Sequence, residues 1–393
     1  MSGLYQPESG ERHGGASRGA HPWFVVESDP VNGELPYLKV KGTHREVGRQ
    51  IGEAGRDLVR GELAYYEEQF PLLAGFSYAE CVERARVFLK PSEQFAPQIV
   101  DQLRGLAEGA GVSFDVLFAL NCNEEFTCLP DQPSGPGREG ASAPAGPEHC
   151  TSFAFKADGR IVAGHNEDWY PGDIEFLTVR HVTLKSGVSY LSVGPAGNLP
   201  ITGVTSNGLC GCANTVYSLD LAVGVPNNLL LTSLFECRSL EEVRDRIDAA
   251  PRARGSNHLH ADTSGRIWDI ETTATRLAWL DGGGRFVHTN HYVTPELAPQ
   301  DATTSVGTFK RRARAEELLA AGLEAGEDPV LLGQTVLCDH SNAPLSICAH
   351  WDDDDPSLDQ SVTTASMIWE PAEGAVHVAA GQPCDHEYAT YCL

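Results

Sequence analysis

The sequence predicts an α+β fold in which helices cover the faces of antiparallel sheets. Residues 38–126 show apolar side chains near helical spacing, whereas the chain after residue 150 consists largely of short β-rich runs separated by turn dipeptides. The elements follow in the order strands, helices, strands, helix and strand, without the regular alternation that is typical of a parallel α/β fold. We therefore expect sheets enclosed by helices.

The N-terminal part is expected to be polar first and helical afterwards. Residues 1–37 form a polar, Gly-rich extension. From Leu38 a short strand leads through a Gly-Thr start signal into a long helix. A helix pair follows in residues 78–111, with a break predicted at Pro91 and glycines at its end. Ser113 is the expected N-cap of the next helix.

A clear boundary lies at residues 129–149, "LPDQPSGPGREGASAPAGPEH". Prolines, glycines and small residues leave this span almost nothing to bury, so we expect an exposed, mobile loop. The chain is therefore divided into the 1–37 extension, a mainly helical segment of residues 38–149 that ends in this loop, and a segment of residues 150–393.

The segment after the boundary predicts antiparallel strands. The turn dipeptides are Asp158-Gly159, Ser186-Gly187 and Asn207-Gly208. Residues 226–250 predict one or two helices, with a capping box at Ser239, and residues 256–293 return to strands. The basic amphipathic stretch at 307–323 predicts a helix, and residues 374–383 a last strand. The run "DGGGR" at 281–285 lacks the Lys and Ser/Thr of a nucleotide P-loop, so it indicates a hairpin turn.

Composition excludes several kinds of partner. The chain carries 54 acidic and 29 basic residues, a net charge of -25, which repels nucleic-acid phosphates and anionic lipids. No stretch approaches the roughly 18 apolar residues of a membrane helix, and the N-terminus lacks the apolar block of a signal peptide. We expect a cytoplasmic protein with no nucleic-acid and no membrane partner, and the acidic run "WDDDDP" at 351–356 is expected to be solvated surface.

The cysteines divide into packing residues and one exception. Eleven cysteines without a secretory signal or any CxxC motif indicate reduced thiols rather than a disulfide framework. Cys81, Cys237, Cys338 and Cys348 lie in apolar surroundings and are expected to pack as small hydrophobic residues. Cys150 differs, because it stands where the 129–149 loop meets the first predicted strand of the second segment.

A thiol at that junction suggests a particular chemistry. Cysteine is a nucleophile only as the thiolate, and its ordinary pKa of about 8.5 means that it needs a base or a positive charge nearby. A cut between His149 and Cys150 would create an α-amine with a pKa of about 7.7–8.0, which can act as the base for its own side chain. An isolated cysteine before a strand is more often simply buried, so both interpretations stay open on the residues alone.

Six motifs follow one another between residues 38 and 385. They are "KGTHREVGRQIGEAG", "IVDQLRGLAEGAGVSFDVLFALNCNEEF", "CTSFAFKADGRIVAGHNEDW", "TSNGLCGCAN", "GRFVHTNHY" and "NAPLSIC". Together they resemble the acyl-CoA:6-aminopenicillanate acyltransferase-like family of autoproteolytic N-terminal nucleophile (Ntn) hydrolases, which includes β-alanyl-amine hydrolases. The resemblance implies a four-layer αββα sandwich, with one chain of residues 1–149 and another of residues 150–393 that stay associated after the cut.

The resemblance also implies roles for individual residues. The nucleophile that follows the self-cleavage site falls on Cys150, in a Cys-Thr pair, and the acid eighteen residues later falls on Asp168. The oxyanion-hole asparagine falls on Asn290 and a pocket-lining serine on Ser256. The chain departs from the family pattern at His149, where members often carry glycine.

A second departure concerns the substrate. Ala349 stands where the penicillin-converting enzyme has an arginine, so a penicillin substrate is not carried over.

These implications predict a cysteine amidohydrolase or acyltransferase. The expected substrate is a small N-acyl amide or acyl thioester such as an acyl-CoA, and neither a metal nor an organic cofactor is expected. The choice between water and an amine as acceptor stays open. For Asn166 two alternatives stay open as well: it holds its loop by local hydrogen bonds, or it contacts the substrate.

Two other functions compete with this one. The runs "HLHAD" at 258–262 and "HTNH" at 288–291 place histidines at alternate positions, as in zinc sites, which would suit a zinc-dependent amidohydrolase. No HExxH-like cluster supplies further ligands. The third alternative is an uncut, catalytically idle scaffold that binds acyl amides or a protein partner. Self-cleavage before Cys150 separates the first hypothesis from both others.

Overall fold

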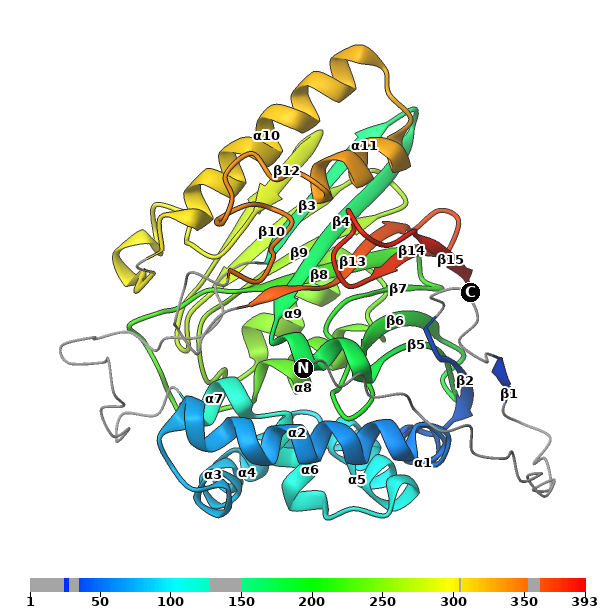
Figure 1. The fold of residues 1–393 in the computed structure, drawn as a ribbon, viewed down its shortest axis with the longest axis vertical. Coiled ribbons are helices and arrows are strands. Elements are labelled where there is room, and N and C mark those ends of the chain that lie inside the picture. Colours follow the sequence, from blue (N-terminus) through cyan, green and yellow to red (C-terminus); the bar gives the residue numbers. More distant parts are fainter. Residues whose placement is uncertain (1–24, 28–34, 128–149, 304, 353–360) are drawn as a thin grey trace, which may run out of the picture.

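The chain folds into four layers, in which two sheets packed face to face are covered on both outer sides by helices (Figure 1). The computed structural model describes residues 25–27, 35–127, 150–303, 305–352 and 361–393. The predicted loop at 129–149, His149, most of the 1–37 extension and most of the "WDDDDP" run lie outside these residues.

The larger sheet has nine strands and the smaller has six. In spatial order the larger sheet contains β1 (Val25–Glu27), β2 (Tyr37–Gly42), β5 (Leu177–Leu184), β6 (Ser189–Pro195), β7 (Gly203–Thr205), β8 (Leu209–Thr215), β9 (Ser256–Asp262), β10 (Ile267–Thr272) and β11 (Leu277–Asp281). The smaller sheet contains β12 (Arg285–His288), β3 (Thr151–Ala157), β4 (Arg160–Trp169), β13 (Val362–Glu370), β14 (Ala375–Ala380) and β15 (Ala389–Cys392). The described strands pair antiparallel except β2 and β5, which are parallel.

The helices form the two outer layers. Those packed on the larger sheet are α1 (His44–Ala54), α2 (Arg56–Ala74), α3 (Tyr78–Ala85), α4 (Leu89–Phe95), α5 (Pro97–Ala110), α6 (Phe114–Leu120), α7 (Asn123–Thr127), α8 (Asn227–Leu234) and α9 (Leu240–Ala249). Those on the smaller sheet are α10 (Gly307–Ala325) and α11 (Pro329–Leu337). Short 3₁₀ turns occur at Arg86–Phe88, Pro171–Phe176 and Ala298–Gln300.

Three apolar clusters fill the three interfaces between the layers. Strand β3 shows how the sequence divides its side chains among them: Phe153 and Phe155 pack against Leu319 and Val336 of the outer helices, whereas Ala154 faces the other sheet. This alternation follows from the two-residue period of a strand. The four-layer αββα sandwich expected from the resemblance is therefore confirmed.

Several local predictions are confirmed. Thr43 caps α1 through a complete capping box with Glu46, and Ser239 caps α9. The turn between β3 and β4 has positive φ at both Asp158 and Gly159, as a two-residue hairpin loop requires. Ser113 stands at the N-cap of α6, although its side chain makes no capping bond.

Two local predictions are wrong. Pro91 does not break its helix, because it lies in the first turn of α4, where a missing N–H costs no intrahelical bond; the chain bends at Ala96 instead. Residues 282–284 do not close a hairpin. They carry the chain from β11 in the larger sheet to β12 in the smaller one, and Gly283 has a φ of 59° in this crossing.

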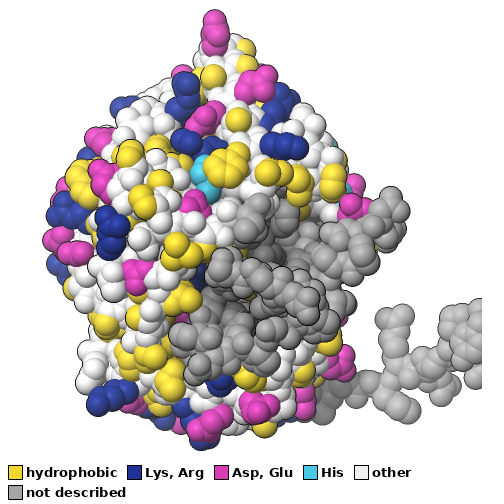
Figure 2. Space-filling model, turned by 90° about the vertical axis from the view of Figure 1, so that its left-hand side faces the viewer, with side chains coloured by type: hydrophobic (Ala, Val, Ile, Leu, Met, Phe, Trp, Pro, Cys, Tyr) yellow, Lys and Arg dark blue, Asp and Glu magenta, His cyan; other side chains and the backbone are white. Residues whose placement is uncertain are grey.

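Two further observations concern the surface. No helix among the described residues is long and apolar enough to cross a membrane. The face shown in Figure 2 carries acidic, basic and hydrophobic side chains interspersed with one another.

Candidate active site around Cys150

Cys150 lies directly before β3, a strand that is paired on both sides, with β12 and with β4. The residue is only 4% exposed, yet it lines a pocket between the two sheets. Its position at the end of a doubly paired strand fixes the thiol relative to the pocket without help from the residues before it.

The pocket has an apolar wall and a polar end. The apolar side chains are Trp169, Leu177, Val193, Leu199, Ile201, Ala213, Ala365 and Met367. Around Cys150 lie Glu124, Glu167, Asn214 and Asn227. The pocket holds about 810 Å³ with its opening to solvent included, which is within the roughly 300–1,000 Å³ typical of small-molecule sites.

Arg311 of α10 holds the backbone at the nucleophile. Its Nη1 donates to the carbonyl oxygen of Cys150 at 2.7 Å and to Thr151 Oγ1 at 3.1 Å, and its Nη2 donates to Asn290 Oδ1 at 2.9 Å. Sequence reasoning missed this residue, because the helix reads as a basic amphipathic one. The available signal is that Arg311 falls at helical spacing with the buried Ala315 and so faces the core.

Glu167 is a second residue that sequence reasoning missed. Its Oε1 lies 3.9 Å from Cys150 Sγ, and its Oε2 lies 2.9 Å from Nε2 of the buried His165. His165 Nδ1 in turn lies 2.8 Å from Ser152 Oγ. Alternation along β4 sends Glu167 into the pocket and its neighbour Asp168 to the opposite face of the strand.

Asp168 is fully buried beside the nucleophile. Its Oδ1 accepts a hydrogen bond from Thr363 at 2.6 Å, and its main-chain oxygen lies 3.9 Å from Cys150 Sγ. Within the described part of the chain its Oδ2 has no hydrogen-bond partner. Burial raises the pKa of the Asp168 carboxyl well above its usual value, while the Thr363 hydrogen bond and the Arg311 charge act in the other direction.

The same surroundings act on the thiol. Burial raises the pKa of Cys150 well above its usual value, the charges of Glu167 and Asp168 raise it further, and Arg311 lowers it. In the uncut chain the sulfur is therefore held as a thiol.

Asn290 lies near the nucleophile but does not line the pocket. Its Oδ1 accepts from Arg311, and its Nδ2 donates to the carbonyl oxygen of Thr215 at 3.0 Å. Asn214, one residue earlier on β8, does line the pocket, and neither atom of its amide has a partner among the described residues.

The other two predicted substrate contacts lie outside the pocket lining. Asn166 Nδ2 donates to the carbonyl oxygens of Leu337 and Ile347, both at 2.9 Å, which supports the loop-holding alternative. Ser256 Oγ lies behind the wall and accepts a bond from Nδ2 of Asn227, which does line the pocket, at 3.2 Å.

The histidines of "HLHAD" and "HTNH" do not assemble a shared zinc site in the described structure. His288 uses both ring nitrogens, toward Glu271 at 2.8 Å and toward the carbonyl oxygen of Thr289 at 2.7 Å. The described groups of three or more potential ligands include His288 with Asp269 and Glu271, but not His258, His260 or His291.

Comparison with known proteins supplies the family. Part of the chain is similar to Beta-alanyl-dopamine/carcinine hydrolase of Drosophila melanogaster, with 25% identity over 231 residues, which is 54% of this chain and 57% of the relative. The match thus spans little more than half the length of that relative.

Two solved structures are also similar. Penicillin V acylase from Agrobacterium tumefaciens gives a TM-score of 0.43 at 14% identity, covering 59% of this chain and 83% of the other. The N-acylethanolamine-hydrolyzing acid amidase ortholog of Caenorhabditis elegans gives 0.41 at 16% identity, covering 62% and 100%. The family model for acyl-coenzyme A:6-aminopenicillanic acid acyl-transferase matches residues 155–385, more than half of the chain. The chain therefore belongs to the acyl-coenzyme A:6-aminopenicillanic acid acyl-transferase family.

Proposed function

We propose that this chain is a cysteine amidohydrolase or acyltransferase that matures by cutting itself between His149 and Cys150 and then acts on a small N-acyl amide or acyl thioester. The observation that carries the proposal is the position of Cys150. Its side chain lines a pocket of small-molecule size, while Arg311 holds its carbonyl group at the start of a doubly paired strand. Family membership and the named hydrolase relative support the same class of reaction.

The cut would supply what the uncut site lacks. The buried thiol has a raised pKa, so it needs a base close at hand. In the proposed maturation Cys150 Sγ attacks the carbonyl carbon of His149, the Cys150 nitrogen leaves as an amine, and water opens the thioester. The new α-amine, with an ordinary pKa of about 7.7–8.0, keeps a substantial neutral fraction that can accept the thiol proton.

Asp168 is proposed to hold the protonated amine beside the sulfur. It is buried against Cys150, and its Oδ2 has no hydrogen-bond partner among the described residues. A buried carboxylate is costly unless it is paired, and an ammonium group at the new chain end would pair with it. The cut would thus lower the cost of ionising Asp168 and the pKa of the Cys150 thiol together.

Turnover would follow from the same groups. The thiolate attacks the acyl carbon of the substrate, the leaving amine takes a proton from the α-ammonium, and the acyl group stays on Cys150 as a thioester. Attack by water then gives a hydrolase, and attack by a second amine gives an acyltransferase. The tetrahedral oxyanion needs a hydrogen-bond donor, a contact that contributes about 3 kcal/mol in comparable enzymes.

Two asparagines are candidates for that donor. Asn290 is the residue implied by family resemblance, but its Nδ2 is bound to Thr215 and would have to be released. Asn214 already lines the pocket with an amide that has no partner in the described structure. Comparing kcat in Asn290→Ala and Asn214→Ala decides between them: the donor's loss lowers kcat about 100-fold or more, while the other variant retains most of it.

The primary test is intact mass of the purified full chain. Self-cleavage predicts two fragments that separate before Cys150, and a single full-length species in Cys150→Ala. The cut protein is then assayed against N-acyl amines, peptides and acyl-CoA thioesters. Active protein that consists of one unbroken chain contradicts the proposal and leaves the zinc or scaffold hypotheses.

A further inference from the structure

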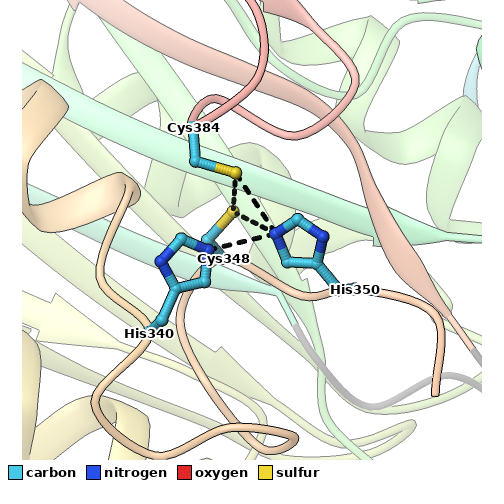
Figure 3. Close-up of side chains that lie close together, drawn as sticks. All are labelled: His340, Cys348, His350 and Cys384. Carbon is cyan, nitrogen blue, oxygen red and sulfur yellow. Dashed lines mark hydrogen bonds between the residues drawn. The ribbon is translucent and has the colours of Figure 1, made fainter.

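Four potential metal ligands converge on the outside of the smaller sheet, away from the Cys150 pocket. His340, Cys348 and His350 lie on the loop after α11, and Cys384 lies on the loop between β14 and β15. Figure 3 shows the four side chains pointing toward one another from these two loops. We propose that they form a four-coordinate zinc site.

The distances fit a tetrahedral ion. Zinc bonds of about 2.3 Å to sulfur and about 2.05 Å to nitrogen set two sulfurs about 3.8 Å apart, a sulfur and a nitrogen about 3.6 Å apart, and two nitrogens about 3.3 Å apart. The Sγ atoms of Cys348 and Cys384 are 3.8 Å apart. His350 Nε2 lies 3.5 Å from Cys348 Sγ, 3.2 Å from Cys384 Sγ and 3.0 Å from His340 Nε2.

The donor set selects the ion. Two thiolates and two imidazoles suit zinc, whereas magnesium and calcium prefer oxygen ligands. All four ligand atoms lie within 4.8 Å of one another, so a single ion can reach them. Binding releases the two thiol protons to solvent, and the two negative charges on sulfur then balance the charge of the zinc ion.

Packing, a disulfide or a histidine pair would each account for less of this geometry. Cys348 is predicted from the sequence to be plain packing, but its sulfur faces a second thiol and an imidazole, which are not apolar neighbours. A disulfide requires sulfurs about 2.05 Å apart, so Cys348 and Cys384 are not bonded to each other here. A hydrogen bond between His340 and His350 would leave the convergence of both thiols unexplained.

Such an ion would be structural rather than catalytic. All four positions are filled by the protein, and none of the four residues lines the pocket at Cys150. The ion would fasten the loop that contains Ala349, whose N–H donates to Thr363 Oγ1 at 2.9 Å. Thr363 in turn donates to Asp168, so the zinc site would steady one support of the candidate active site.

The test measures metal content in the full-length protein, purified under reducing conditions and then exposed to excess zinc and desalted. We expect one zinc per chain, lost in Cys384→Ser and His350→Asn. Cys384 and His350 are exposed, so these changes leave the core intact. The matched controls are Cys392→Ser, an exposed thiol outside the cluster, and Cys150→Ala, which removes the thiol of the pocket. Both controls should keep the zinc.

Cobalt gives an independent readout of the ligands. Cobalt(II) in place of zinc should show the visible bands of tetrahedral coordination and thiolate-to-cobalt charge transfer, both of which disappear in Cys384→Ser. Absence of zinc uptake, a spectrum without thiolate bands, or zinc that is retained in Cys384→Ser but lost in Cys150→Ala would each overturn the proposal. Neither measurement depends on self-cleavage or turnover.

Discussion

Thr363→Val probes the link between the smaller sheet and Asp168. The change keeps the shape of the side chain but removes the hydroxyl that donates to Asp168 Oδ1 at 2.6 Å and accepts from the N–H of Ala349 at 2.9 Å. A hydrogen bond to a charged group contributes roughly 1.5–3 kcal/mol, and 1.36 kcal/mol corresponds to one pKa unit. Because this bond lowers the pKa of Asp168, its loss should raise that pKa by about one to two units.

The assay is the pH dependence of kcat/KM in the matured variant. If ionised Asp168 is required, activity falls as the pH drops through its pKa, so the acid limb in Thr363→Val should move to higher pH by about one unit or more. Thr364→Val is the matched control, because its hydroxyl donates to the main-chain oxygen of Glu167 and not to a carboxylate. An unshifted acid limb in an active, fully cut Thr363→Val protein would refute the role given to Asp168.

Three further predictions follow from named contacts. In the uncut Cys150→Ala protein, Asp168→Asn should raise the free energy of unfolding at neutral pH. A raised carboxyl pKa means that stability present below the unfolded value, near 3.8, is lost as the pH rises through the folded value, so urea unfolding at several pH values should show the gain vanish in acid; a gain that does not depend on pH contradicts this. Arg311→Lys keeps the charge but not the fork, so kcat/KM should fall about tenfold or more, with Arg312→Lys as the unaffected neighbour, and equal activity in both contradicts the clamp. Asn166→Ala leaves two buried carbonyls unpaired and should cost about 2–4 kcal/mol in denaturant unfolding with KM unchanged, whereas a raised KM would restore the substrate-contact alternative.

The parts of the fold that the sequence predicts are those set by local chemistry. The β3–β4 hairpin follows from Asp158-Gly159, and α1 begins where Thr43 can cap it. The path at 282–284 could not be predicted in the same way, because a run of glycines permits a turn but does not determine which sheet pairs with the next strand.

The candidate site divides in the same way. Cys150 and Asp168 lie on two adjacent strands and could be found from their spacing and from family resemblance. Arg311 is 161 positions away from Cys150, and only the packing of α10 on the smaller sheet brings its guanidinium to that carbonyl. The zinc ligands His350 and Cys384 are likewise separated by 34 positions, and no short motif joins them.

The parallel pairing of β2 with β5 means that both sides of the boundary at residue 149 share one sheet. Severing the backbone there would leave an obligate two-polypeptide particle of fixed one-to-one stoichiometry, because pulling the pieces apart would strip β5 of its neighbour and expose the cluster beneath the larger sheet. Residues 150–393 expressed alone would therefore aggregate, and co-expression with residues 1–149 from a separate gene would be the way to recover them.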